Sequence, residues 1–144
     1  MSTFVLDASV TMSWLLGDAK PVDRAYAETV LDALRNPDFA ARVPVTWALE
    51  VGNVVARAEA RGFVAEAQSE AFLEMLSGIA IQFDDATVAH ALTDTLHLAR
   101  RYGLSSYDAS YLELALRAGL PLATLDTDLS KASRKAGVTR FGPR

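Results

Sequence analysis

Short apolar runs alternate with longer stretches of helical periodicity along the chain. The short runs predict strands at residues 4–6, 43–45, 79–83, 122–125 and 138–141. The periodic stretches predict helices at residues 9–16, 21–34, 47–60, 65–76, 86–102, 105–119 and 129–136. Strands separated by helices need crossover connections. We therefore expect an α/β fold with a mostly parallel sheet covered by helices on both faces.

The carboxyl ends of the predicted strands are where a binding site is expected. In open parallel sheets, ligands bind beyond these ends, at the point where the strand order reverses. Asp7 directly follows the first predicted strand, and Asp126 directly follows the strand at residues 122–125. The sequence thus places two carboxylates where a site would form.

Two further acids stand in apolar surroundings, whereas most of the 18 acidic residues lie on polar helix faces. Glu50 lies early in a predicted helix whose neighbours are nearly all apolar, and Asp108 lies within Ser105–Leu112. Carboxylates are rarely buried unless they are paired or bound to a metal. Glu50 could pair with an arginine in the core, but a functional role is the favoured interpretation because a dry glutamate without a strong partner is costly.

Helix capping offers a structural alternative for the other three acids. Asp7 could cap the helix that follows it, and Asp126 or Asp128 could cap the last short helix. Asp108 stands three residues after Ser105, which is the spacing of a capping box. Capping explains each acid taken singly, but it does not explain why four of them fall near the same sheet edge.

A shared divalent cation would relieve the repulsion between four neighbouring carboxylates. The chain has no cysteine, which excludes a thiolate zinc site and a cysteine nucleophile, and its only histidines are His90 and His97. Oxygen ligands alone favour Mg²⁺ or Mn²⁺ over Zn²⁺. Such a metal can activate a water and neutralise charge on a phosphate, so the sequence indicates phosphodiester cleavage.

Size and composition agree with a single cytoplasmic domain. The chain has 144 residues, of which 51% are hydrophobic, enough for one core without disulfides. Its first residues lack the charged and apolar regions of a signal peptide, and no apolar run approaches the roughly 20 residues that cross a bilayer. The net charge of −4 argues against a protein that coats nucleic acid through bulk charge.

The pattern of these residues resembles the PIN-domain nucleases, and in particular the VapC-type toxins of bacterial toxin–antitoxin modules. The resemblance covers essentially the whole chain. It rests on four segments, which are Val5–Ser9, Glu50 with Asn53, Tyr102–Ala109 and Leu122–Asp126. Each segment alone is a weak indication, but their order, spacing and placement together are specific to this family.

The resemblance implies a three-layer α/β/α sandwich of the PIN type and a metal site at its acidic positions. The family's Mg²⁺ or Mn²⁺ ligands would correspond to Asp7, Glu50, Asp108 and Asp126. Ser9 and Thr124 match hydroxyl positions that orient these ligands, and Asp128 is a further candidate beside the metal. Related toxins cleave RNA endonucleolytically, are usually homodimers, and are usually blocked by a small antitoxin protein; the resemblance implies the same partners here.

Local cations would have to hold the RNA, because the chain as a whole is acidic. Arg57 lies seven residues after Glu50 on the same helix face, and Lys131, with Arg134 and Lys135, lies near the last acid. Solvated surface charge is the alternative explanation for each of them.

Three other functions are compatible with parts of the pattern. A phosphotransferase with Asp7 as nucleophile commonly needs a second acid two residues later, where this chain has Ser9. A receiver domain usually needs an acidic pair after its first strand, and only Asp7 is present there. A catalytically silent PIN-like binding module would be expected to lack some of the four acids.

Overall fold

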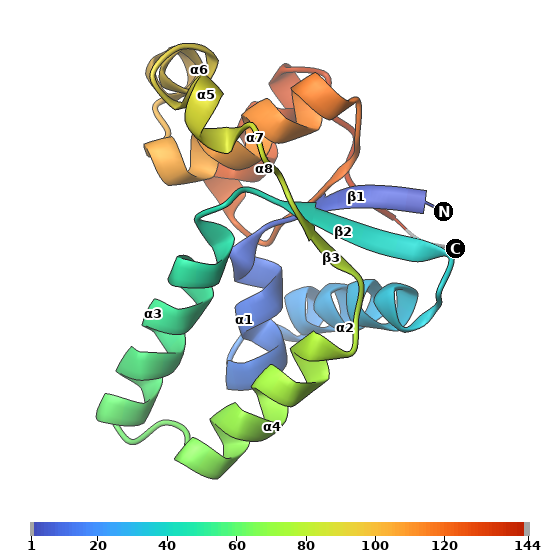
Figure 1. Cartoon of the computed structure of the whole chain (residues 1–144), viewed down its shortest axis with the longest axis vertical. Coiled ribbons are helices and arrows are strands. Elements are labelled where there is room, and N and C mark those ends of the chain that lie inside the picture. The colour runs from blue at the N-terminus through green and yellow to red at the C-terminus, as the bar shows by residue number, and fades with distance from the viewer. Residues whose placement is uncertain (1, 143–144) are drawn as a thin grey trace.

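A computed structural model describes residues 2–142 as a four-stranded sheet between two layers of helices (Figure 1). The strands are β1 (Ser2–Leu6), β2 (Phe39–Val43), β3 (Ile81–Phe83) and β4 (Leu122–Ala123). The helices are α1 (Ala8–Leu16), α2 (Pro21–Arg35), α3 (Trp47–Ala60), α4 (Glu66–Ser77), α5 (Thr87–Ala91), α6 (Asp94–Tyr102), α7 (Ser106–Ala118) and α8 (Thr127–Lys135).

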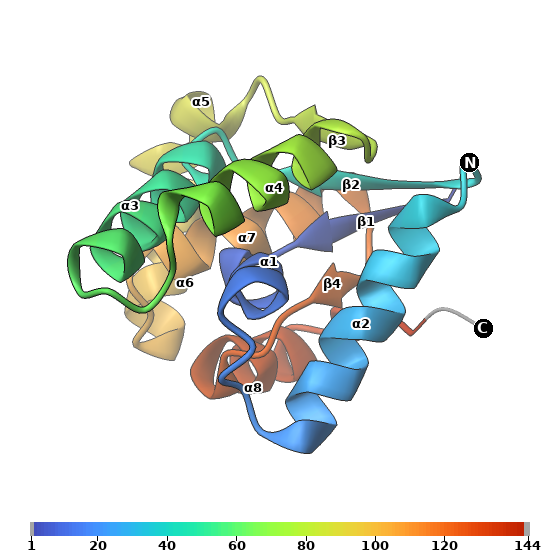
Figure 2. The same ribbon diagram turned by 90° about the horizontal axis from the view of Figure 1, so that it is seen from below.

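The sheet is parallel throughout, with the strand order β3-β2-β1-β4. Helices α1 to α4 cover one face and α5 to α8 the other, as Figures 1 and 2 show from two directions. The three-layer α/β/α sandwich expected from the sequence is confirmed. From β1 the chain adds β2 and β3 on one side of the sheet and then β4 on the opposite side of β1, so the strand order reverses between β1 and β4. In such sheets, ligands bind in the crevice at the carboxyl ends of the two strands where the order reverses.

The core lies on both faces of β1 and against α7. Phe4, Val5 and Leu6 are completely buried, as expected for a central strand covered on both sides. Phe4 stacks on Phe141, with 3.7 Å between the ring centroids. The C-terminal segment therefore closes the core near the amino end of β1. The carboxyl end of β1, where Asp7 lies, is left for the site.

Two strands differ from the sequence prediction. The strand predicted at residues 43–45 is β2, which ends at Val43 because Pro44 has no N–H to continue the ladder. Its alanines are poor strand formers, so pairing with β1 and β3 on both sides determines this strand rather than local propensity. The strand predicted at residues 138–141 is reduced to one parallel bridge between Leu122 and Arg140.

The helix predicted at residues 86–102 is divided into α5 and α6. Thr93 takes a non-helical conformation (φ −119°, ψ −96°), which breaks the hydrogen-bond ladder between the two helices. His90 nevertheless bonds to Asp94 across the break, with Nδ1 2.8 Å from the carboxylate oxygen. Within residues 2–142, no helix combines the length and apolar character needed to span a bilayer.

Candidate functional site

Asp7 is held at the carboxyl end of β1 by two hydroxyl groups. The side chain is 3% exposed, and its Oδ2 accepts hydrogen bonds from Ser9 Oγ (2.6 Å) and Thr124 Oγ1 (2.7 Å). Asp7 occupies the cap position of α1, but its carboxylate makes no capping hydrogen bond. The capping alternative therefore does not account for the Asp7 carboxylate.

The same hydroxyls join the loops that follow β1 and β4. Ser9 Oγ accepts the N–H of Leu125 at 2.9 Å, and Thr124 Oγ1 accepts the N–H of Asp126 at 3.0 Å. The Asp7 backbone N–H also donates to the carbonyl of Ala123 at 2.9 Å. These bonds fix Asp7 and the β4–α8 loop relative to each other, although they are more than a hundred residues apart in the sequence.

Glu50 reaches the site from the first turn of α3. It is half-buried, and its Oε1 accepts a hydrogen bond of 2.9 Å from the hydroxyl of the buried Tyr111 on α7. The pKa of Glu50 is raised to about 7, and burial is the largest cause. The Tyr111 hydrogen bond lowers this pKa in part, whereas the negative charges of Asp7 and Asp108 contribute to the rise. No arginine pairs with Glu50 in the described part of the chain.

Asp108 lies in the first turn of α7. Ser105 caps this helix by accepting the Asp108 backbone N–H at 3.1 Å, while the Asp108 carboxylate itself makes no capping bond. The pKa of this carboxyl is raised to about 6, mainly by burial and in smaller part by the negative charges of Asp7, Asp126 and Asp128. Ser105 thus supplies the cap, and the neighbouring acid stays available to a ligand.

Asp126 both caps a helix and contributes charge to the site, so the two interpretations offered by the sequence hold together. Its Oδ2 caps α8 by accepting the N–H of Leu129 at 2.8 Å. Its negative charge also raises the pKa of Asp7, although burial of Asp7 is the larger cause. One carboxylate oxygen of Asp126 is therefore used to stabilise the helix, and its charge acts on the neighbouring acids.

The four acids, which we call the acid site, share uncompensated negative charge. They are Asp7, Glu50, Asp108 and Asp126. No lysine, arginine or histidine in residues 2–142 forms an ion pair with any of them. Nor do any three carboxylates or imidazoles in those residues converge tightly enough to form a ready-made metal cage. The negative charges of neighbouring acids contribute to the raised pKa values of Asp7, Glu50 and Asp108. A shared cation would have to draw the carboxylate oxygens closer together.

A cleft of about 670 Å³ opens beside Glu50 and Asp108. It is also lined by Leu49, Asn53, Ser105, Tyr107 and Thr46. Thr46 occupies the cap position of α3, but its side chain makes no capping hydrogen bond, and its buried Oγ1 has no partner among the described residues. A free hydroxyl at the wall of this cleft suits a polar group of a ligand.

Sequence reasoning missed Thr46 and Tyr111 as members of the site. Thr46 precedes a helix, where threonine is a common cap, so its position in the sequence does not indicate a ligand. Tyr111 stands three residues after Asp108, so the two side chains share one face of α7. That spacing was the available indication, since it places the phenol on the same side of the helix as the acid.

The basic residues proposed for RNA lie outside this cleft. Arg57 lines a separate hollow with Arg61 and Phe63, near the far end of α3. Lys131 is exposed on α8. The structure therefore brings the four acids towards one place but does not bring these two cations into it.

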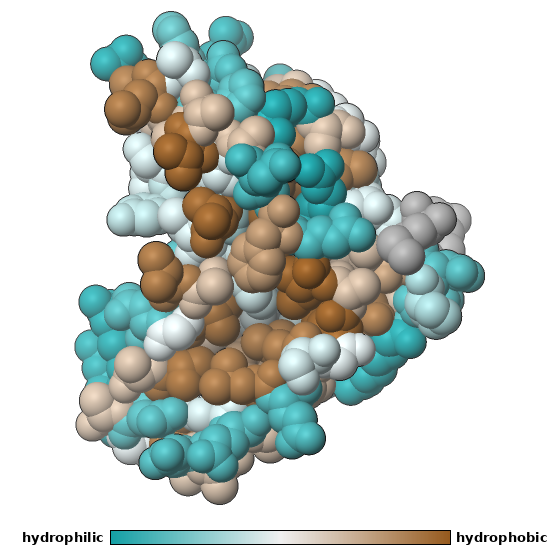
Figure 3. All heavy atoms as spheres, in the orientation of Figure 1, coloured by the Kyte–Doolittle hydropathy of each residue, from teal (hydrophilic) through white to brown (hydrophobic). Residues whose placement is uncertain are grey.

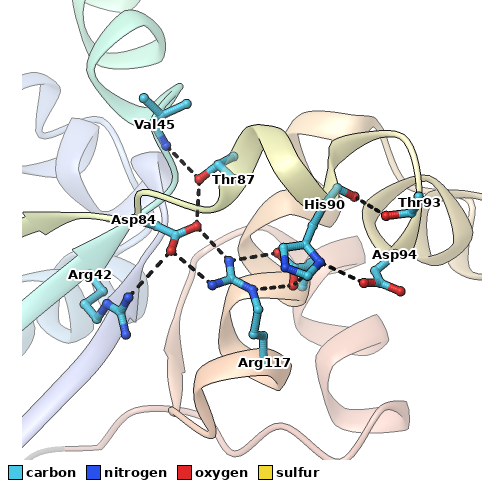
Figure 4. Close-up of polar contacts among 9 residues, drawn as sticks. Arg42, Val45, Asp84, Thr87, His90, Thr93, Asp94 and Arg117 are labelled. Atoms are coloured by element: carbon cyan, nitrogen blue, oxygen red, sulfur yellow. Dashed lines mark hydrogen bonds and ion pairs between the residues drawn. The ribbon is translucent and has the colours of Figure 1, made fainter.

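A second group of buried acids was also missed. Asp84 is 3% exposed and Glu113 is 5% exposed, so the four acids of the site are not the only ones away from polar faces. Arg117 donates two hydrogen bonds to Asp84 (2.7 and 3.1 Å), as Figure 4 shows. It donates two more to Glu113 (2.8 and 3.1 Å). Arg42 lies 3.5 Å from Asp84. We call these four residues the arginine network.

Comparison with known proteins identifies the family. The family model for the PIN domain matches residues 4–135, which includes β4, the carboxyl end of β1 and all four acids of the site. The chain belongs to the PIN-domain family. A curated relative of this PIN domain is Ribonuclease VapC3 from Pyrobaculum aerophilum, which is 28% identical over 127 residues, or 88% of this chain and 92% of that protein.

Solved structures share the fold of this PIN domain. PAE2754 from Pyrobaculum aerophilum superposes with a TM-score of 0.65 at 23% identity, over 96% of this chain and 83% of that one. FitAcB from Neisseria gonorrhoeae has a TM-score of 0.58 at 21% identity, over 99% and 98%. A toxin–antitoxin complex from Klebsiella pneumoniae has a TM-score of 0.54 at 20% identity, over 88% of each chain.

Proposed function

We propose that this PIN domain is a metal-dependent endoribonuclease and the toxin of a type II toxin–antitoxin pair. The observation that carries the proposal is the acid site: Asp7, Glu50 and Asp108 have raised pKa values because they are buried near one another. No basic side chain within residues 2–142 pairs with them. Buried acids without a partner are costly to stability, and a bound cation would compensate them.

The chemistry of the donor set fits Mg²⁺ or Mn²⁺. Carboxylate oxygens together with the free hydroxyl of Thr46 are hard ligands, and the chain offers neither thiolate nor imidazole beside them. Asp7, Glu50, Asp108 and Asp126 would hold the ion, with Asp128 near enough to Asp108 to assist. When bound, the ion would activate a water and neutralise charge on the scissile phosphate.

The residues around the acids prepare them for this role. Ser9 and Thr124 donate to one oxygen of Asp7 and so leave its other oxygen for the cation. Tyr111 donates to one oxygen of Glu50 in the same way. These hydrogen bonds fix the side chains before a ligand arrives, which lowers the entropy lost on binding.

The named relatives support the choice of substrate and partner. One is a ribonuclease and another is part of a toxin–antitoxin complex, so we infer an RNA substrate and a small antitoxin protein for this chain. A basic side chain of the antitoxin would enter the acid site and replace the cation. Arg57 and Lys131 would contact RNA further from the scissile bond. We place this activity in the cytoplasm, as the sequence led us to expect.

A second copy of the chain is the partner that we propose for the apolar surface beside the cleft. Leu49 is 77% exposed, Val88 77% and Leu92 83%, and Figure 3 shows separate apolar patches on the side that carries α5 and the start of α3. Covering such residues in a homodimer would remove them from water. Light scattering should give the dimer mass for the wild type and the monomer mass for Leu92→Asp; a monomeric wild type would contradict the dimer.

Cleavage of RNA by the purified protein tests the proposed activity. We expect Mg²⁺ or Mn²⁺ to be required, and Asp7→Asn to abolish cleavage while keeping the fold, because the amide preserves the shape and removes one negative charge. Asp32→Asn is the matched control, since Asp32 lies on the surface and pairs with Arg35 at 2.9 Å. Equal cleavage by the wild type and Asp7→Asn would indicate a contaminating nuclease. It would favour the alternative that this chain is a catalytically silent binding module.

The phosphotransferase alternative is tested in the same preparation. An aspartyl-phosphate on Asp7 would have to form at a carboxylate that is 3% exposed and already accepts two hydroxyl hydrogen bonds. We expect no phosphate on Asp7 after incubation with acetyl phosphate, as measured by intact mass. A stable adduct that Asp7→Asn removes would replace the nuclease proposal.

A further inference from the structure

A small hollow of about 80 Å³ lies between β4, α8 and the segment that follows α8. Its walls are Leu122, Thr124, Ser130, Ser133, Arg134, Val138, Thr139 and Arg140. The hollow is separate from the cleft beside Glu50 and Asp108, and the two share no lining residue. It is instead connected to the acid site through Thr124, whose hydroxyl donates to Asp7.

The charge of this hollow is positive, in a chain whose net charge is −4. Arg134 and Arg140 are the charged residues of its wall, and no acid lines it. Neither arginine forms an ion pair with an acid among residues 2–142. The Arg140 guanidinium lies 3.8 Å from the centre of the Tyr26 ring, and this stacking holds it in place beside the hollow.

The neutral polar groups of the wall are hydroxyls, and one of them has no partner. Ser133 is 6% exposed, and its buried Oγ makes no hydrogen bond with any described residue. Leaving a buried hydroxyl without a partner is unfavourable, because the group has lost its hydrogen bonds to water. Ser130 and Thr139 place further hydroxyls at the same wall. A ligand that accepts hydrogen bonds would supply the partner that Ser133 lacks.

The size of the hollow limits the ligand. A volume of 80 Å³ corresponds to roughly three water molecules, each with a share of about 30 Å³ in the liquid. This space has room for one tetrahedral oxyanion. Paired guanidinium groups and hydroxyl donors are the groups that bind phosphate in proteins.

We propose that this hollow binds a phosphate group, with Arg134, Arg140 and Ser133 as its main donors. Two sources carry this chemistry, namely inorganic phosphate and the terminal phosphate of an RNA strand. Thr124 lines the hollow and also donates a hydrogen bond to Asp7. A phosphate bound in the hollow would therefore be separated from the acid site by the Thr124 side chain. The assignment concerns binding alone and stands whether or not the chain cleaves RNA.

Calorimetric titration with inorganic phosphate tests the site without requiring any activity. The full chain is titrated in EDTA at constant ionic strength, so that no metal binds and no RNA is cleaved. We expect binding to the wild type, at least tenfold weaker binding to Arg134→Gln, and unchanged binding to Arg100→Gln. Arg100 is an exposed arginine on α6, and replacing it removes the same charge elsewhere. Equal weakening in both variants would show an adventitious ion only and would overturn the proposal, as would no binding to the wild type.

The melting temperature of Ser133→Ala gives a second test, whose expected result differs from the result of a folding defect. Removing an unpartnered hydroxyl should leave the melting temperature of the phosphate-free protein unchanged or higher. The rise in melting temperature that phosphate causes in the wild type should become smaller in this variant. A full phosphate-induced rise in Ser133→Ala would overturn the role of the serine.

A short RNA with a 5′-phosphate or a 5′-hydroxyl distinguishes the two sources, again in EDTA. Tighter binding of the phosphorylated RNA, with the difference lost in Arg134→Gln, assigns the hollow to an RNA end. Equal binding of the two RNAs, together with phosphate binding that depends on Arg134, assigns it to free phosphate. A preference for the phosphorylated RNA that persists in Arg134→Gln places that phosphate elsewhere and overturns the proposal.

Discussion

The chain buries two groups of acids, and the protein treats them in opposite ways. In the arginine network, Arg117 makes two hydrogen bonds to each of Asp84 and Glu113, and these bonds lower the pKa of Asp84 although burial alone would raise it. In the acid site, no described cation pairs with the carboxylates, and the pKa of Glu50 rises to about 7.

The difference separates a structural use of carboxylates from a functional one. Arg117 joins α7 to the end of β3 and thus stabilises the face of the sheet that carries α5 to α7. The acid site contributes no such stabilisation, because its charges repel one another. Folding stability does not explain why mutually repelling acids lie at the ligand-binding end of the sheet. Binding of a cation at this end is the simplest explanation.

The largest effect is expected from removing Arg117, which bonds to both acids of the arginine network. Arg117→Met leaves Asp84 and Glu113 buried without a bidentate partner, and this should cost about 3 kcal/mol of the free energy of unfolding. Urea unfolding at pH 7 measures the loss, with Arg100→Met as the control on α6. A loss no larger than that of the control would mean that the network adds little to stability.

In the acid site, unlike in the arginine network, removing a charged group should not lower the stability of the metal-free protein. Asp7→Asn removes one of the repelling charges, so the metal-free variant should be as stable as the wild type or more stable. Its affinity for Mn²⁺ should fall at least ~10-fold, because a ligand is lost. Calorimetry with Mn²⁺ measures the affinity, and Asp32→Asn serves as the surface control. An unfolded Asp7→Asn protein would show that Asp7 is structural.

The sequence contained most of what was needed for the fold and for the acids that follow strands. The apolar runs that contain β1 and β4 stop just before Asp7 and Asp126, so the positions of these acids could be predicted, although β4 itself ends at Ala123. Glu50 was recognisable from its apolar neighbours. These features are local, and each is visible in a short window of sequence.

The arginine network could not be predicted because its pairs are set by tertiary structure. Asp84 lies 33 residues from Arg117, and no local pattern shows that the two will meet. Glu113 lies four residues before Arg117, which predicts a surface helix pair rather than a buried one. The unpartnered hydroxyls of Thr46 and Ser133 were hidden for the same reason: only coordinates show that a hydroxyl lacks a partner.

A pH series should separate the two groups without any mutation. The pKa values of Glu50 and Asp108 are raised to about 7 and about 6, so the metal-free protein should lose stability as pH rises from about 4 through 7. Asp84, whose pKa is lowered, acts in the other direction, since its stabilising contribution is lost only below its usual value of 3.8.

The expected size of the pH effect is modest because Glu50 and Asp108 are only half-buried. We expect the melting temperature of the metal-free protein to be lower at pH 8 than at pH 5 by a few degrees, roughly what 1 kcal/mol produces in a domain of this size. Saturating Mg²⁺ should reduce this difference, because the ion compensates the charges. A melting temperature that rises steadily from pH 5 to pH 8 without metal would contradict the uncompensated acid site.

The smallest effect is expected from Tyr111→Phe, which removes one hydroxyl and keeps the buried ring. The hydroxyl donates to Glu50 at 2.9 Å and so favours the charged form of this carboxyl. Its loss should raise the pKa of Glu50 further and cost about 1 kcal/mol of stability. Protons then compete better with the metal, so Mn²⁺ binding should weaken several-fold at pH 7 and recover as the pH is raised to 8.5. Tyr102→Phe, on α6, is the matched control. A packing role for Tyr111 alone would reduce stability without this shift in the pH dependence of metal binding, so the shift decides between the two roles.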